Sequence, residues 1–151
     1  MYKLDYKDKK IIEVLKNNAD YTTRQIAKKT LLPITTIHNR IKKLKKENVI
    51  TKFTIDLDPM SVGKSFSVYI LISANLMFLK QNKRTQYDIA KDLKKFEFTE
   101  LVDIVSGGTD LIVKVNVKDV QEFDNILLNK IQKIEGIEKT QSLVVIHKTK
   151  S

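Results

Sequence analysis

The chain has 151 residues, enough for one domain of ordinary size or two small ones. Hydrophobic residues make up 42% and charged residues 30%, while Gly and Pro are few, and this composition excludes a largely disordered chain. Cysteine is absent and there are only two histidines, so the sequence predicts no disulfide, no metal site and no cofactor. It contains no apolar run of about 18 residues and no apolar leader, so we expect a soluble cytoplasmic protein.

The net charge of +10 is concentrated in the first third of the chain. Residues 1–52 contain 14 Lys and Arg against 5 Asp and Glu, a net of +9, whereas residues 53–151 contain 14 against 13, a net of +1. A basic module joined to a nearly neutral one is typical of proteins that bind a polyanion such as DNA. The alternative is a solubilising surface of scattered lysines, which the clustering disfavours.

Two short helices are predicted in the first 30 residues. Residues 4–19 have apolar side chains on one helical face, and Asp5 and Asp8 lie near the start, where the helix dipole favours negative charge. A second helix begins at Thr22, which with Gln25 three residues later matches a capping box.

A third helix is predicted between Pro33, which fits a first helical position, and Asn48, which suits a left-handed cap. We expect a single apolar stripe to face the core, formed by Ile34, Ile37, Ile41 and Leu44. Residues 49–58 then alternate apolar and polar side chains and are predicted as a β-strand. Three short helices followed by a strand indicate a winged helix-turn-helix, whose third helix enters the DNA major groove.

The outward side of this third helix has short polar and basic side chains. Polar residues near its N-terminus can reach base edges, and lysines further along can neutralise phosphates. We therefore predict as DNA contacts Thr35, Thr36, His38, Asn39, Arg40, Lys42, Lys43 and Lys46. The alternative is an ordinary amphipathic helix with a solvated basic face, which the short preceding helix and the following strand disfavour.

The rest of the chain follows a hinge with Pro59 and Gly63 and predicts the order β-α-β-β-α-β. The segments are residues 65–76, 83–96, the two strands of 98–117 joined at Gly107–Gly108, residues 119–135 and 137–148. This order is that of a ferredoxin-like sandwich, which makes the whole chain an α+β protein. Its helices cover only one face of the sheet. Because the second face is then buried by another subunit, we expect at least a homodimer.

The pattern also predicts domain limits and the buried faces of the two C-terminal helices. We divide the chain into a DNA-binding domain over residues 1–52, a strand and hinge linker over 53–64, and an oligomerisation and effector-binding domain over 65–151. We expect the two helices to bury Tyr87, Ala90 and Leu93, and Val120, Phe123, Leu127 and Ile131.

The motifs together resemble the leucine-responsive regulatory protein/AsnC family of prokaryotic transcription regulators, also called feast/famine proteins. "LPITTIHNRIKKLKKENVITKFTIDLD" is similar to the family's "LSxSTVxxRIxxLExxGVIxGYxAxxD". "VSGGTD" is similar to the family's "VTGxYD". "IEKTQSLVVIHK" is similar to "VxxTxTxxVLxxxK" of the family's RAM domain. The resemblance covers almost the whole chain and implies a sequence-specific regulator of double-stranded DNA that forms dimers, which in this family often assemble into octamers.

The resemblance also implies a small effector, often an amino acid, bound between dimers near the hairpin. It places as effector contacts Gly107, Gly108, Asp110, Thr140 and Ser142. Thr109 stands where the family has an aromatic residue, which bears directly on the effector's identity.

Catalysis and RNA binding are the alternatives to DNA binding. Relatives of this family in haem biosynthesis decarboxylate tetrapyrroles, but "VDIVSGGTD" lacks the His or Arg of their site, and no catalytic constellation is present elsewhere. RNA binding through the ferredoxin-like half is disfavoured because that half is nearly neutral and lacks an aromatic "GFGFV" run. We therefore expect a regulator without enzymatic activity.

Overall fold

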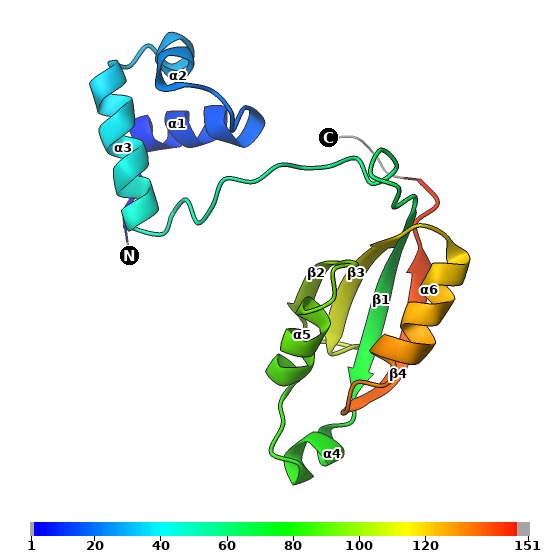
Figure 1. Ribbon diagram of the computed structural model, residues 1–151. Coiled ribbons are helices and arrows are strands. Elements are labelled where there is room, and N and C mark those ends of the chain that lie inside the picture. The colour runs from blue at the N-terminus through cyan, green and yellow to red at the C-terminus, as the bar shows by residue number, and fades with distance from the viewer. Residues whose placement is uncertain (1, 148–151) are drawn as a thin grey trace. The chain divides into compact units, whose positions relative to one another are not determined.

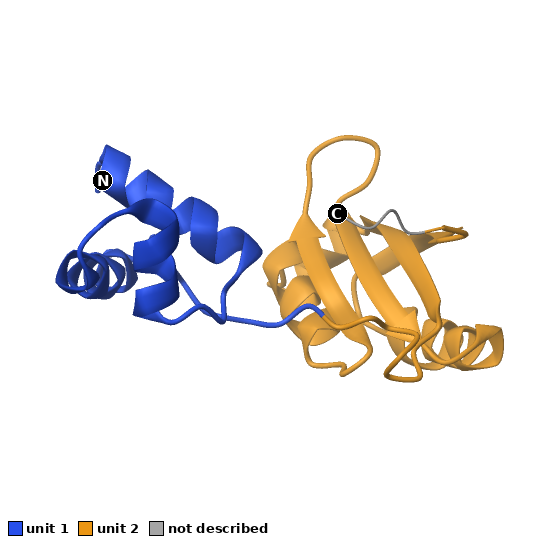
Figure 2. Cartoon of the chain, turned by 90° about the horizontal axis from the view of Figure 1, so that it is seen from above, with its two compact units in different colours: residues 1–56 blue, residues 57–151 orange. Residues whose placement is uncertain are grey.

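The computed structural model describes residues 2–147. Within them the chain divides into two compact units at residues 56 and 57 (Figures 1 and 2). Each unit has its own cluster of buried apolar side chains. No helix in the described part of the chain is long and apolar enough to cross a membrane.

The N-terminal unit is a bundle of three helices (Figure 1). They are α1 over Tyr6–Asn17, α2 over Thr23–Thr30 and α3 over Ile34–Lys46. The predicted capping box of α2 is confirmed, with the Thr22 side chain accepting from the Gln25 N–H. Asp5 and Asp8 form a second capping box at the start of α1. These caps satisfy backbone groups that the first helical turn leaves without partners.

One core cluster of this unit joins all three helices through Ile11, Leu15, Ile26 and Ile37. The predicted stripe of α3 is correct at Ile37 and at Leu44, which are fully buried, but wrong at Ile34, which is 46% exposed. The helix starts only at Ile34, so this residue lies at the rim of the bundle and has no preceding turn to pack it inward.

The ends of α3 are close to those predicted. Pro33 stands one position earlier than expected, as the N-cap, and gives no side-chain hydrogen bond. Asn48 takes the left-handed conformation, with φ 54°, as predicted. The N–H of Val49 then reaches back to the carbonyl oxygen of Leu44 at 2.9 Å, which closes the helix.

The strand predicted over residues 49–58 is not formed. Residues 51–58 are exposed and have no regular secondary structure, although Phe53, Ile55 and Leu57 alternate with polar residues as a strand would require. A strand needs a neighbouring backbone for its hydrogen bonds. The described residues of the N-terminal unit contain no other strand, so the segment has no partner within it.

The C-terminal unit has the predicted β-α-β-β-α-β order. Its elements are β1 over Phe66–Ala74, α4 over Leu76–Gln81, α5 over Gln86–Lys94, β2 over Thr99–Ile104, β3 over Leu111–Val117, α6 over Val120–Ile126 with a π-helical turn over Leu127–Ile131, and β4 over Ile137–Val144. The short α4 was not predicted, and Asn75 caps it by accepting from the Phe78 N–H at 2.9 Å. The sheet is antiparallel with strand order β2-β3-β1-β4.

The core of this unit lies between one face of the sheet and the helices. Alternate residues of β3 face this core, and all four of them are buried: Leu111, Val113, Val115 and Val117. The helical faces were predicted partly wrongly, because Tyr87 and Val120 are exposed while Ile89 and Ile126 are buried. Both errors fall in the first two positions of a helix, where the helical period does not decide burial.

Gly136 is required where the chain turns into β4. Its φ is +97°, and a Cβ built there would lie 2.4 Å from Cδ2 of the buried Leu79. We expect Gly136→Ala to lower the free energy of unfolding of the C-terminal unit by about 2–4 kcal/mol, from overpacking and backbone strain together. Chemical denaturation should show this decrease, and Gly108→Ala, where a Cβ would meet open space, should change little.

The other face of the sheet is more open. Its cross-strand neighbours include Leu71 with Gln141 and Ser73 with Lys139, none of them fully buried. The loop between β2 and β3 spans residues 105–110 and is longer than the tight turn predicted at its two glycines. The N–H of Val105 donates to the carbonyl oxygen of Asp110 at 2.9 Å and closes this loop.

Candidate functional site

The outward side of α3 consists of polar and basic residues. Thr35, His38 and Asn39 are exposed in its first half. Their spacing of three and four residues places them on one side of the helix, and the exposed lysines of the second half continue that side. Those lysines are Lys42, Lys45 and Lys46. Lys45 was not among the residues predicted from the sequence, although its spacing of three from Lys42 was a usable signal.

Three of the predicted contact residues lie instead on the side of α3 toward the start of α1. Thr36 is half-buried, and the Lys43 ammonium stands 4.9 Å from the centre of the Tyr2 ring. Arg40 is engaged by carboxylates of the α1 N-terminus. Thr36 and Arg40 therefore lie away from the centre of the candidate DNA-binding surface, whereas Lys43 is exposed at its edge.

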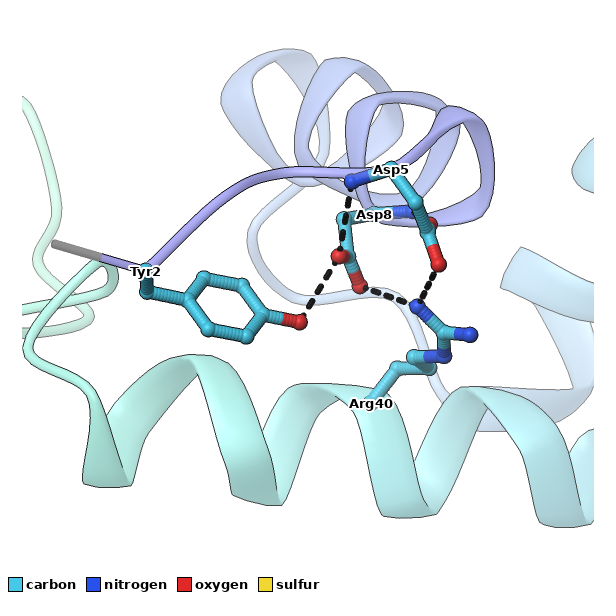
Figure 3. Close-up of polar contacts among 4 residues, drawn as sticks. All are labelled: Tyr2, Asp5, Asp8 and Arg40. Atoms are coloured by element: carbon cyan, nitrogen blue, oxygen red, sulfur yellow. Dashed lines mark hydrogen bonds and ion pairs between the residues drawn. The ribbon is translucent and has the colours of Figure 1, made fainter.

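The Arg40 guanidinium joins the third helix to the capping box of the first (Figure 3). Its Nη1 donates to Oδ1 of Asp8 at 3.0 Å and also to Oδ2 of Asp5. Oδ2 of Asp8 accepts from the Tyr2 hydroxyl at 2.8 Å and from the Asp5 N–H at 3.2 Å. The Asp8 side chain is 0% exposed, so this network offsets the free-energy cost of removing its carboxylate from water.

The same network shifts the pKa values of its members. The hydrogen bond from the Asp8 N–H, followed by that from Arg40, holds the pKa of Asp5 below its ordinary value of 3.8. Hydrogen bonding to Asp5 and then to Asp8 raises the pKa of the Arg40 guanidinium, which stays charged at any pH at which the protein is folded. The hydrogen bond to Asp8 raises the pKa of the Tyr2 hydroxyl.

The lowered pKa of Asp5 predicts acid sensitivity of the N-terminal unit. Because the folded-state pKa is the lower one, ionised Asp5 stabilises the fold above pH 3.8, and this contribution disappears as the pH falls through the folded value. We expect Asp5→Asn to be less stable than the wild type at neutral pH and to lose less stability on acidification. Thermal denaturation between about pH 2 and 6 measures this, with the exposed Asp20→Asn as control. Parallel pH profiles for wild type and Asp5→Asn would contradict the assignment.

The predicted effector residues do not come together within one chain. Asp110 accepts from the Ala74 N–H at 2.9 Å and from Nε2 of Gln86 at 2.7 Å, so both carboxylate oxygens hold the loop to β1 and α5. Thr140 pairs with Ile72 and Ser142 with Ile70, whose side chains are in the core. Directly opposed residues share a face. Thr140 and Ser142 therefore belong to the helix-covered face.

A hollow of about 310 Å³ lies on the open face, beside the β2–β3 loop. It is lined by Leu71, Ser73, Gly108, Thr109, Lys139 and Gln141. Of the predicted effector residues only Gly108 takes part. The Thr109 hydroxyl donates to the Ile72 carbonyl oxygen at 2.8 Å, so it fastens the loop to β1. No group of acidic, His or Cys side chains that could hold a metal ion occurs among the described residues.

A three-helix unit with a basic third helix, joined to a βαββαβ unit with a hollow on its sheet, defines a helix-turn-helix regulator with a ligand-binding domain. Comparisons with known proteins agree. Residues 4–51 match the winged helix-turn-helix DNA-binding family, and residues 73–151 match the Lrp/AsnC ligand binding domain. The chain is 37% identical over 145 residues to the HTH-type transcriptional regulator FL11 of Pyrococcus horikoshii, covering 95% of this chain and 89% of that protein.

Solved structures show the same fold. Escherichia coli AsnC is 25% identical, with a TM-score of 0.83 over 99% of this chain and 97% of that one. The regulator NMB0573 of Neisseria meningitidis, solved as a complex with L-Met, has a TM-score of 0.87 at 22% identity, over 99% and 94%. The chain belongs to the Lrp/AsnC family of helix-turn-helix transcription regulators. It is a DNA-binding regulator and not an enzyme.

Proposed function

We propose that this regulator acts in the cytoplasm and docks the outward side of α3 in the major groove of duplex DNA. Thr35, His38 and Asn39 contact base edges, because the N-terminal part of a recognition helix lies deepest in the groove. The second half of the helix contacts phosphates through Lys42, Lys45 and Lys46. The observation that carries this proposal is that this exposed side is polar and basic along its length, while Ile37 and Leu44 on the opposite side are buried.

Alanine variants of α3 test this orientation. Duplexes are first selected from a random-sequence library by the wild-type protein. The difference in binding free energy between selected and random duplexes should then fall in Thr35→Ala and in Asn39→Ala. The expected decrease is about 1–3 kcal/mol for each good base contact that is lost. Thr36→Ala is the matched control, because this threonine is half-buried on the other side. A Thr36→Ala effect as large as that of Asn39→Ala would mean that the helix is rotated.

The open face of the sheet supports a second proposal, that the C-terminal unit holds the protein as at least a dimer. Leu101 and Leu143 are exposed on the face opposite the core, where they lie beside Lys114 of β3 and Tyr69 of β1. Ser73 and Lys139 lie on the same face, so the contact surface is mixed in polarity. The two copies of α3 in such a dimer would reach half-sites one or more DNA turns apart. Further assembly to an octamer is what the family resemblance implies. A monomer by light scattering at micromolar concentration would contradict the dimer.

The hollow on the open face supports a third proposal, a small carboxylate-bearing effector such as an amino acid. Lys139 is the only charged side chain among those that line it and can pair with the carboxylate. Asp110 positions the loop through its two hydrogen bonds and does not bind the effector's ammonium group. Calorimetry with the twenty amino acids should find a ligand whose binding Lys139→Met weakens. Binding unchanged in that variant would place the site elsewhere.

A further inference from the structure

The turn before α3 holds a leucine in a backbone conformation that side chains rarely adopt. Leu31 ends α2 with φ 59° and ψ 27°, and its N–H donates to the Ala27 carbonyl oxygen at 2.8 Å. In this left-handed region a Cβ crowds the neighbouring carbonyl oxygen, so glycine is the usual residue there. Packing does not offset the strain, because Leu31 is 87% exposed.

A second aliphatic residue is exposed three positions later. Ile34 is the first residue of α3 and is 46% exposed. The core does not depend on this pair, because Leu32, between them in the chain, already packs against the cluster of the N-terminal unit. Because no packing within the unit offsets the backbone strain at Leu31, the strain favours a contact between this residue and another molecule.

The position of the pair indicates what that contact is. Ile34 and His38 are four residues apart and share one side of α3, and Thr35 is adjacent in sequence. The N-terminal residues of such a helix lie against base edges. In the major groove the apolar group that a base presents is the 5-methyl of thymine. The net charge of +9 over residues 1–52 favours DNA over a protein partner at this surface.

We propose that Leu31 and Ile34 form an apolar contact with thymine 5-methyl groups and so select for thymine at the end of each half-site read by the start of α3. The inference rests on the proposed docking of α3 in the major groove. It adds a discrimination that the histidine and asparagine side chains of α3 do not supply, because they read hydrogen-bonding groups.

Removal of single methyl groups from the DNA tests the contact directly. Duplexes selected by the wild-type full chain are resynthesised with deoxyuridine in place of one thymidine at a time, which deletes the methyl and keeps the base pair. At one or two positions in each half-site, binding should weaken about four-fold for each methyl removed. Leu31→Gly and Ile34→Ser should bind the thymine and uracil duplexes equally at those positions.

The controls separate this contact from charge and from folding. Lys42→Ala should weaken binding to every duplex and keep the full response to deoxyuridine. Leu31→Gly relieves the left-handed strain, so its melting temperature should equal or exceed that of the wild type while its discrimination falls. If the wild type binds selected duplexes with no response to deoxyuridine, the thymine contact is wrong for both residues. If one variant keeps the full response, the contact is wrong for the residue that was replaced. In both cases the docking of α3 stands. If no duplex is enriched or bound, the docking itself is wrong.

Discussion

Arg40→Met is expected to lower the free energy of unfolding of the N-terminal unit by about 2–3 kcal/mol. The variant keeps much of the aliphatic volume of the arginine and removes the cation that faces the buried Asp8 carboxylate. Asp8 would keep its hydrogen bonds from Tyr2 and from the Asp5 N–H but would be a buried charge without an opposite charge (Figure 3).

This destabilisation should appear in chemical denaturation of the N-terminal transition. Arg24→Met, which removes an exposed arginine of α2, is the matched control and should change stability little. Arg40→Lys should retain part of the stability, because an ammonium offers a charge but not the planar fork of a guanidinium. An Arg40→Met protein as stable as the wild type would show that the ion pairs are not formed in solution.

Replacing Lys42, Lys45 and Lys46 together by alanine is expected to remove most of the salt dependence contributed by α3. Removing one lysine–phosphate ion pair reduces the slope of log affinity against log salt by about 0.9, so removing three reduces it by about 2.7 for each bound helix. Affinity for all sequences should fall together, because phosphates carry no base identity.

Titration at several salt concentrations measures this slope. A matched triple substitution on the other unit is Lys91, Lys94 and Lys95 to alanine, exposed residues in and just after α5. This control should leave the slope nearly unchanged, since residues 53–151 have a net charge of only +1. Equal reductions of the slope in the two triple variants would mean that the basic surface of α3 is not the phosphate-binding surface.

Local features of the fold were predictable from the sequence because they depend on residues close together in the chain. The capping pair Thr22 and Gln25 and the left-handed Asn48 are set by neighbours within four residues. The alternating core face of β3 follows from the two-residue period of a strand.

Other features depend on interactions that no local pattern contains. The ion pair between Arg40 and Asp8 joins residues 32 positions apart, so the sequence did not show that Arg40, which was predicted as a DNA contact, binds a carboxylate of α1. The apolar stripes were wrong at Ile34, Tyr87 and Val120, all in the first two positions of a helix, where the helical period does not decide burial.

The face of the sheet on which the predicted effector residues lie also depends on such interactions. Thr140 and Ser142 alternate along β4 as predicted, but which face they occupy depends on their register with Ile72 and Ile70 of β1. That register is a tertiary property, and a shift of one residue would reverse the face. Lys139 and Gln141, one position away from the predicted residues, line the hollow instead.

The most direct test of the central claim uses the absence of cysteine from the chain. A single cysteine at Glu47, the exposed residue that follows the last turn of α3, can be tagged with an iron chelate that cuts nearby DNA. We predict cuts within or beside each protected half-site of a selected duplex, and none from the same tag at Lys94 in α5. Cutting from Lys94 without cutting from Glu47 would contradict the docking of α3 in DNA.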